Sequence, residues 1–234
     1  MPKREVFTPA AVTEALSELV SLLTESQQGE LRRSYTLLRL PKKASVYGEG
    51  ARPEHLYCVL RGGVKEEKEG PGSRRQTLRV LGPGEYFGYR AYFAGERCEA
   101  TASTLEPTVV CALPLELIER WMSVNTALCR FFVRRLSLDL GRADHRTVSL
   151  TQKHIRGRLA EALLFLKGNY GLEADGATLS IFLSREDLAN LSNMTTSNAI
   201  RTLSAFCAEG MVAVDGRKIT LLDEAALVRL SKQG

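Results

Sequence analysis

The chain has 234 residues, of which 44% are hydrophobic and 25% charged, and its formal net charge is +5. This composition is typical of a soluble globular protein with one large or two modest domains. The first residues lack the apolar core of a signal peptide and no later run approaches a membrane span, so we expect a cytoplasmic protein.

The five cysteines are scattered and form no C-x-x-C spacing. An odd number without paired spacing argues against a disulfide framework and a tetrahedral zinc site. We therefore expect small buried hydrophobic residues rather than metal ligands. The cysteines are Cys58, Cys98, Cys111, Cys129 and Cys207.

The apolar pattern predicts one or two short amphipathic helices within residues 14–34. Short runs rich in Val, Leu, Tyr and Thr follow, separated by Gly, Pro and charged residues. Such runs predict short strands in an antiparallel roll or barrel. They lie at 35–50, 55–70, 76–88 and 100–114, with an exposed hairpin tip at 69–76.

A short helix is predicted from Pro114 to Met122, and Asn125 can cap a longer helix over about 126–146. The longer helix has two apolar stripes, whereas a helix on the surface of a monomer needs only one. We therefore expect it to pack on its own roll and on a second copy; burial within one chain is the alternative. The expected dimer interface comprises Leu128, Cys129, Phe132, Leu136, Leu140 and Ala143.

After a hinge at 148–154, the pattern predicts a helix over about 152–168 and a short strand at 177–183. Two short helices come next, and then two apolar strands flank Asp215 and Gly216, a dipeptide typical of a tight hairpin. This order is that of a winged helix-turn-helix.

The two short helices occupy "SREDLANLSNMTTSNAIRTLSAF", Ser184 to Phe206. Ser184 and Asp187 have capping-box spacing, Thr195 can cap the second helix, and Asn193 suits a turn that needs a positive φ. The predicted buried face of the second helix comprises Ala199, Ile200, Leu203 and Phe206.

The opposite face of the second helix is polar, and in a DNA reader such a face enters the major groove. A simply solvated face is the alternative. The residues expected to contact DNA are Thr195, Thr196, Ser197, Asn198, Arg201 and, on the hairpin, Lys218. Charge does not locate this site, because residues 150–234 hold ten Lys/Arg and nine Asp/Glu.

Four segments resemble, in order, the family of the cyclic-AMP receptor protein and the fumarate–nitrate regulator (the CRP/FNR family). "KKASVYGEGARPEHLYCVLRGGVK" is similar to the early strands of its β-roll, and "LGPGEYFGYRAYFAGERCEATA" to its phosphate-binding cassette. "SVNTALCRFFVRRLSLDL" resembles the family's dimer helix, and "LSREDLANLSNMTTSNAIRTLSAF" its helix-turn-helix.

The resemblance implies an α+β fold. An N-terminal cyclic-nucleotide-binding-like double-stranded β-roll would occupy 1–125, a dimerisation helix and hinge 126–148, and a winged helix-turn-helix 149–234. It also implies a homodimer that binds a palindromic promoter site and works with RNA polymerase. An effector in the roll would reposition the DNA-reading helices.

The cassette departs from the cyclic-AMP pattern of this family. Tyr89 stands where cyclic-AMP binders have a glutamate for the ribose, and Cys98 and Glu99 stand where arginine and serine hold the phosphate. A one-residue shift would let Arg97 serve instead. We therefore expect an effector other than cyclic AMP. The candidate effector pocket is Gly88, Tyr89, Arg90, Arg97, Cys98 and Glu99.

Other effectors follow from branches of the same family. No cysteine cluster precedes the roll, which disfavours an iron–sulfur centre. A haem-, nitric-oxide- or redox-responsive member is an alternative, with His55, His145 or His154 as axial ligands, although structural or solvent-facing roles are the simpler interpretation.

The predicted recognition helix also differs from the pattern of this family. Ser197 occupies a position where many members have glutamate, so the usual half-site of the family is not expected, while Arg201 keeps its role. No catalytic motif is visible, which argues against an enzyme. A nucleotide-binding module that acts on a protein partner without DNA is the alternative from another class.

Overall fold

The computed structural model describes residues 7–73 and 75–232. The chain forms two compact units. The first comprises the described residues up to Lys65 together with Val80–Asp139, and the second comprises Glu66–Arg79 together with the chain from Leu140 onward. No helix in the described part of the chain has the length and apolar character needed to cross a membrane.

Three short helices begin the first unit: α1 (Pro9–Ala15), α2 (Ser17–Val20) and α3 (Glu25–Ser34). Thr24 starts α3 with a capping box, because its hydroxyl accepts from the N–H of Gln27 and the Gln27 side chain accepts from the Thr24 N–H. The predicted helical region is therefore confirmed, as a run of helices that starts a few residues earlier.

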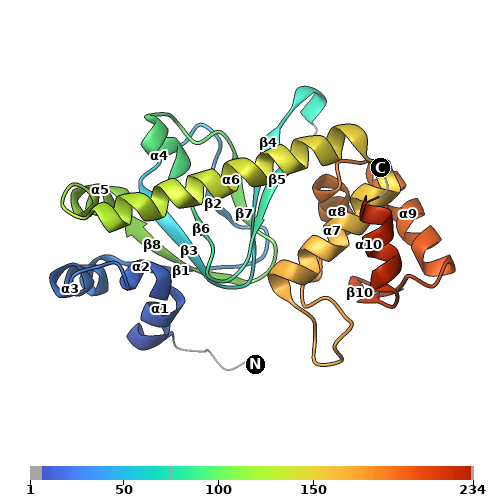
Figure 1. Cartoon of the computed structure of the whole chain (residues 1–234), viewed down its shortest axis with the longest axis horizontal. Helices are drawn as coiled ribbons and strands as arrows, with labels where there is room; N and C mark the ends of the chain where they lie inside the picture. Colours follow the sequence, from blue (N-terminus) through green and yellow to red (C-terminus); the bar gives the residue numbers. More distant parts are fainter. Residues whose placement is uncertain (1–6, 74, 233–234) are drawn as a thin grey trace. The chain divides into compact units, whose positions relative to one another are not determined.

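Two four-stranded sheets form the β-roll (Figure 1). One has the order β1-β8-β3-β6 and the other β2-β7-β4-β5. All four predicted strand-rich segments are confirmed, and each contains two strands. The strands are β1 (Thr36–Leu40), β2 (Ser45–Tyr47), β3 (His55–Arg61), β4 (Val64–Glu69), β5 (Arg75–Leu81), β6 (Tyr86–Phe87), β7 (Thr101–Thr104) and β8 (Thr108–Pro114).

Short helical segments interrupt the roll. The 3₁₀ turn η1 (Pro71–Ser73) lies between β4 and β5, where the hairpin tip was expected, and α4 (Arg90–Ala94) follows β6. After β8, the helix α5 (Leu115–Met122) starts behind Pro114 as predicted.

The helix α6 (Thr126–Gln152) is longer than predicted and continues through most of the expected hinge. Asn125 caps it as expected, because its side-chain oxygen accepts from the N–H groups of Ala127 and Leu128. Figure 1 shows α6 running along the roll. Its residues Phe131 and Phe132 are buried. The centre of the Phe131 ring lies 5.6 Å from that of Tyr86, and the centre of the Phe132 ring lies 5.4 Å from that of Tyr89.

The second unit contains the C-terminal elements. They are α7 (Ile155–Tyr170), α8 (Arg185–Leu191), α9 (Thr196–Ala208), β9 (Val212–Asp215), β10 (Lys218–Leu221) and α10 (Glu224–Lys232). The predicted helix, two short helices and hairpin are all present, and α10 was not predicted. Asp215 pairs with Lys218, so the tight turn is Gly216–Arg217, one residue later than expected.

The prediction of a strand at 177–183 is wrong, because no regular strand forms there. Only isolated bridges form there, with Leu172 opposite Leu179 and Thr178 opposite Thr220. The wing strands contain four residues each, so they offer this segment few backbone partners. Its alternating apolar side chains Leu179, Ile181 and Leu183 are nevertheless buried, which explains the strand-like pattern.

Candidate DNA-binding and effector sites

The turn between α8 and α9 has the geometry that the sequence predicts. The Ser184 hydroxyl accepts from the Asp187 N–H at 3.1 Å, and the Thr195 hydroxyl accepts from the Asn198 N–H at 3.2 Å. Asn193 has a φ of 49°, in the left-handed region that asparagine tolerates better than most residues. Both caps and the positive φ are therefore confirmed.

Asn193 provides a test of this turn. We expect Asn193→Ala to lower the free energy of unfolding by about 1 kcal/mol, because alanine is strained at a left-handed φ. Asn193→Gly should leave stability unchanged or raise it, because glycine has no Cβ. Urea denaturation of both variants measures the difference, and equal losses would contradict the assigned cause.

The second helix of this motif, α9, has one buried and one exposed face. Ala199, Thr202, Leu203 and Phe206 are buried, as predicted for three of the four expected residues. The prediction for Ile200 is wrong, because its side chain is 47% exposed. Apolar residues at both 199 and 200 fit a helical stripe, and only the packing of α9 decides between them.

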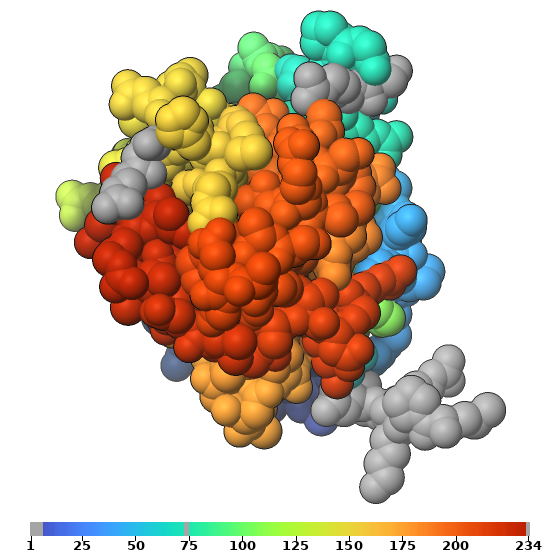
Figure 2. Space-filling model, turned by 90° about the vertical axis from the view of Figure 1, so that its right-hand side faces the viewer, coloured from blue at the N-terminus to red at the C-terminus, as the bar shows by residue number. Residues whose placement is uncertain are grey.

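The expected DNA-contacting residues lie on the exposed side of the second unit. Thr195, Thr196, Ser197 and Arg201 are exposed, and Asn198 is half-buried. The Asn198 Oδ1 accepts a hydrogen bond from Arg201 Nη2 at 2.8 Å, which restrains the guanidinium at the N-terminal half of α9. The orange-to-red surface in Figure 2 belongs to the C-terminal part of this unit.

The wing hairpin is connected to the helix-turn-helix. Arg185, the first residue of α8, donates to the carbonyl of Gly216 in the hairpin turn at 2.7 Å. Lys218 begins β10 just after this turn and is exposed. The hydrogen bond therefore fixes the turn beside the start of α8, with Lys218 accessible to solvent or a ligand.

An ion pair anchors the C-terminal end of α9. Arg156 on α7 donates two hydrogen bonds to Glu209, at 2.7 and 2.6 Å, and its guanidinium lies 5.2 Å from the centre of the Phe206 ring. The hydrogen bonds from Arg156 lower the pKa of Glu209. This bidentate pair holds α9 against α7, which leaves the other end of α9 for recognition.

In the first unit, Tyr89 occupies the cassette position of the family's ribose-binding glutamate. Its side chain is buried, and its ring lies against Phe93 and Phe132. The hydroxyl donates to Asp139 Oδ2 on α6 at 3.1 Å. Tyr89 therefore connects the cassette to α6 through the chain's own side chains.

Two of the remaining cassette residues, Arg97 and Cys98, also have partners within the chain. Arg97 donates from Nη1 to the carbonyl of Gly50 at 3.0 Å, and Cys98 is buried with its backbone bonded to Gly50 and Ala51. Arg90 and Glu99 are exposed. Whether these side chains hold an effector depends on the alignment that the resemblance implies, in which a glutamate for the ribose is missing and Glu99 stands near the phosphate.

Aromatic rings pack together in the roll next to the cassette. Tyr57 stacks on Phe87 with ring centres 5.1 Å apart, and Tyr47 lies 5.8 Å from Tyr57. Gly88 has a φ of 86°, and a Cβ there would lie 2.6 Å from the Tyr57 ring. Glycine is thus required at 88 by close packing as well as by its backbone conformation.

The Tyr89 hydroxyl leads to a second stability prediction. We expect Tyr89→Phe to lower the free energy of unfolding of the protein by about 1.5 kcal/mol, because a half-buried carboxylate loses a donor. Tyr92→Phe is the matched control: its hydroxyl also donates to a carboxylate, Glu119, but at an exposed site. Chemical denaturation should show the larger loss for Tyr89→Phe, and equal losses would contradict this reasoning.

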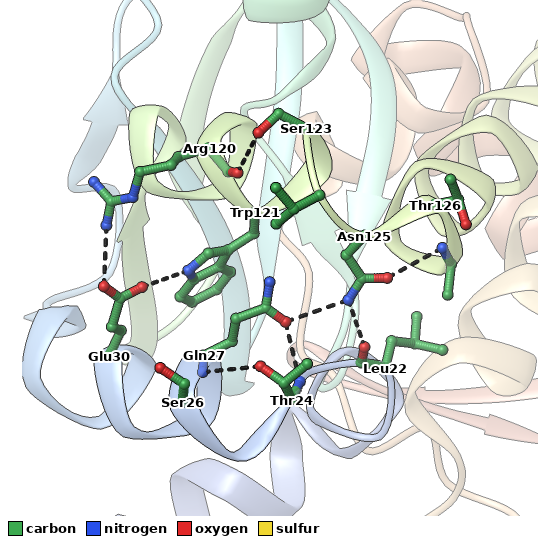
Figure 3. Close-up of a pocket in the computed structure, with 12 residues that line it drawn as sticks. Leu22, Thr24, Ser26, Gln27, Glu30, Arg120, Trp121, Ser123, Asn125 and Thr126 are labelled. Atoms are coloured by element: carbon green, nitrogen blue, oxygen red, sulfur yellow. Dashed lines mark hydrogen bonds and ion pairs between the residues drawn. The ribbon is translucent and has the colours of Figure 1, made fainter.

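A separate pocket of about 650 Å³ lies between α3, α5 and the start of α6 (Figure 3). Within it, Trp121 Nε1 donates to Glu30 at 2.7 Å and Asn125 Nδ2 donates to the carbonyl of Leu22 at 2.7 Å. The indole hydrogen bond lowers the pKa of Glu30. None of the six predicted effector residues lines this pocket, so the pocket is separate from the candidate effector site in the cassette.

The cysteines and histidines are dispersed among the described residues. Cys58, Cys98 and Cys111 are buried as expected, whereas Cys207 is exposed, which corrects that expectation. Burial raises the pKa of Cys111 to about 12 and raises that of Cys58 as well. Within residues 7–73 and 75–232, no three His, Cys, Asp or Glu side chains gather as metal ligands.

The expected dimer residues on α6 divide into two groups. Leu128 and Phe132 are fully buried in the chain's own core, and Leu136 packs against that core. The assignment of Leu128 and Phe132 to a dimer interface is corrected, because a covered side chain presents no surface to a second copy, whereas Leu136 is half-buried. Cys129 is half-buried, while Leu140 and Ala143 are exposed.

Sequence reasoning missed two other exposed side chains on α6. Val133 is 63% exposed and lies on the same side of the helix as Leu140, whereas Val148, which is 50% exposed, lies about 80° round the helix from Leu140. The spacing of seven residues between Val133 and Leu140 was visible in the sequence, but the neighbouring phenylalanines hid it.

Two family models match the chain: that of the cyclic nucleotide-binding domain over residues 37–125 and that of the Crp-like helix-turn-helix domain over residues 157–230. A cyclic AMP receptor protein from Thermus thermophilus is 31% identical over 86% of this chain and 93% of its own length. These matches cover both the roll and the helix-turn-helix.

Solved structures agree with these matches. A CRP-family transcriptional regulator from Thermus thermophilus is 26% identical, with a TM-score of 0.72 over 84% of this chain and 97% of the other. FixK2 from Bradyrhizobium japonicum, at 23% identity, has the same fold with a TM-score of 0.78 over 86% of this chain and 98% of its own. The chain therefore belongs to the CRP/FNR family of DNA-binding transcription regulators, whose members are not enzymes.

Proposed function

We propose that the chain works as a cytoplasmic homodimer whose two α9 helices bind a two-fold symmetric promoter site. The supporting observation is the exposed N-terminal half of α9, where Asn198 restrains Arg201 among exposed hydroxyl groups. In a dimer, two such helices enter successive major grooves about 34–36 Å apart. RNA polymerase is the proposed partner at the promoter.

The proposed dimer interface is the stripe of Val133, Leu140 and Val148 along α6, which we call the α6 stripe. All three side chains are at least half exposed in the single chain. Val133 and Leu140 are seven residues apart and lie on one side of the helix, as in the seam of a coiled coil, and Val148 lies about 80° round the helix from Leu140, at the edge of this face. Pairing of two copies of α6 along this stripe would remove these apolar side chains from water.

We further propose that the roll responds to an effector other than cyclic AMP. Tyr89 and Glu99 replace the groups that would hold the ribose and the phosphate, and Tyr89 is already bonded to Asp139. A ligand that displaces Tyr89 would act directly on α6. Such a ligand would shift the population between dimers with and without a DNA-competent spacing of α9.

Selection of bound fragments from genomic DNA tests the DNA-binding proposal. The full-length protein should enrich fragments that share a palindrome. Absence of a shared sequence would favour the alternative of a regulator that acts on a protein partner.

The effector proposal has its own experiment. Calorimetric titration with cyclic AMP should show no binding, whereas saturable binding would overturn the proposal. Absorbance and mass spectra of the purified protein would identify a ligand that co-purifies, haem included.

A further inference from the structure

One large apolar side chain lies on the exposed face of α9. Ile200 is 47% exposed, whereas its neighbours Ala199 and Leu203 are buried. Together with Phe206, those neighbours complete the packing of α9. A β-branched residue at an exposed helix position has a lower helix propensity than alanine or lysine, so helix formation does not favour isoleucine here.

Ile200 lies at the centre of the face that would meet DNA. It follows Thr196 by four residues and Ser197 by three, and it precedes Ser204 by four. Residues at these spacings share one side of a helix, and these three are exposed. The exposed face of α9 therefore consists of hydroxyl groups around one apolar side chain, with Arg201 beside it.

The major groove offers one apolar feature on its base edges, the C5-methyl group of thymine. We infer that Ile200 reads a thymine in each half-site by contact with this methyl group. The inference rests on the proposed DNA-binding function.

The expected size of this contact follows from the burial of one methyl group. Its loss should weaken binding about fourfold per half-site, and therefore about 15-fold when both halves of a palindrome lose it. An effect of this size is measurable, and it is smaller than the loss of a bidentate arginine contact.

Deoxyuridine separates the methyl group from every other feature of thymine. The most enriched genomic duplex is synthesised with deoxyuridine at one symmetric pair of thymine positions at a time. Affinities of the full-length protein and of Ile200→Ala, Ile200→Val and Ser204→Ala are measured by fluorescence anisotropy at one salt concentration. Circular dichroism confirms that each variant is folded, as expected for changes at exposed positions.

The wild type should bind about 15-fold more weakly when one particular pair of thymines is replaced. Ile200→Ala should bind the thymine duplex and the deoxyuridine duplex equally at that pair of positions. Ile200→Val should keep most of the wild type's preference for thymine, and Ser204→Ala should keep all of it. Retention of full discrimination by Ile200→Ala would overturn the inference.

The failure of the inference can be told apart from failure of the proposed function. A wild type that prefers the selected duplex to a scrambled one but ignores every deoxyuridine replacement overturns the role of Ile200 alone. A selection that enriches no duplex overturns the DNA-binding proposal and this inference together.

Discussion

Arg201→Ala should abolish specific binding to the promoter site while the protein remains a folded dimer. A bidentate arginine–guanine contact contributes about 1–3 kcal/mol, and a dimer loses it twice. The affinity for the selected duplex should therefore fall at least about 30-fold. Arg201 is exposed and its side chain bonds to Asn198 on the same helix, so the fold should not change.

Two control variants separate base reading from loss of charge. Arg229→Ala removes an exposed arginine from α10 of the same unit, where the side chain lies 4.0 Å from Asp223, and should bind as the wild type does. Arg201→Lys keeps the charge but not the bidentate geometry, so it should retain non-specific binding and lose most of the sequence preference. An unchanged footprint of Arg201→Ala would remove α9 from the recognition role.

Local signals in the sequence predicted most of the fold. Glycine, proline and charged residues separate the strands of the roll, and side-chain caps such as Asn125 and Thr195 place the helix starts within a residue or two. The helix α10 escaped prediction, although its cap was visible: the Asp223 carboxylate accepts from the N–H of Ala226. Local signals therefore placed most helix starts and strands, but not the hinge at 148–154 or the segment 177–183.

The side of a helix that faces the core could not be predicted from the sequence. On α6 the adjacent residues Phe132 and Val133 are both apolar, and on α9 so are Ala199 and Ile200. In each pair one residue is buried and the other exposed. Rotation of a helix by one position changes the proposed interface completely, and only the tertiary neighbours fix that rotation. The predicted burial of Ile200 and the predicted exposure of Leu128 and Phe132 to a second copy were therefore wrong.

The cassette shows a further limit of sequence reasoning. The resemblance located Tyr89 at the ribose position, but the identity of its partner depends on how α6 lies along the roll. Asp139 is 50 residues away in the chain, and nothing in the local sequence pairs the two. The hydrogen bond between them joins α6 to the proposed effector site.

The second large effect is expected at the α6 stripe. Leu140→Asp should convert the dimer to a monomer and, with it, remove binding to the palindromic duplex. Each copy would lose the burial of one leucine, worth about 1.5 kcal/mol or more, and would place a carboxylate in an apolar seam. Two copies together should weaken dimerisation more than about 100-fold. Sedimentation velocity measures the mass, and anisotropy measures DNA binding on the same samples.

Leu138→Asp is the matched control for this experiment. Leu138 is 51% exposed and Leu140 is 65% exposed, so the same change at either position should cost the folded chain little. Two residues along an α-helix differ in direction by about 200°, which places Leu138 on the other side of α6. Leu138→Asp should remain dimeric and bind DNA. If Leu138→Asp dissociates while Leu140→Asp does not, the dimer interface lies on the opposite side of α6, and the α6 stripe is not the dimer interface.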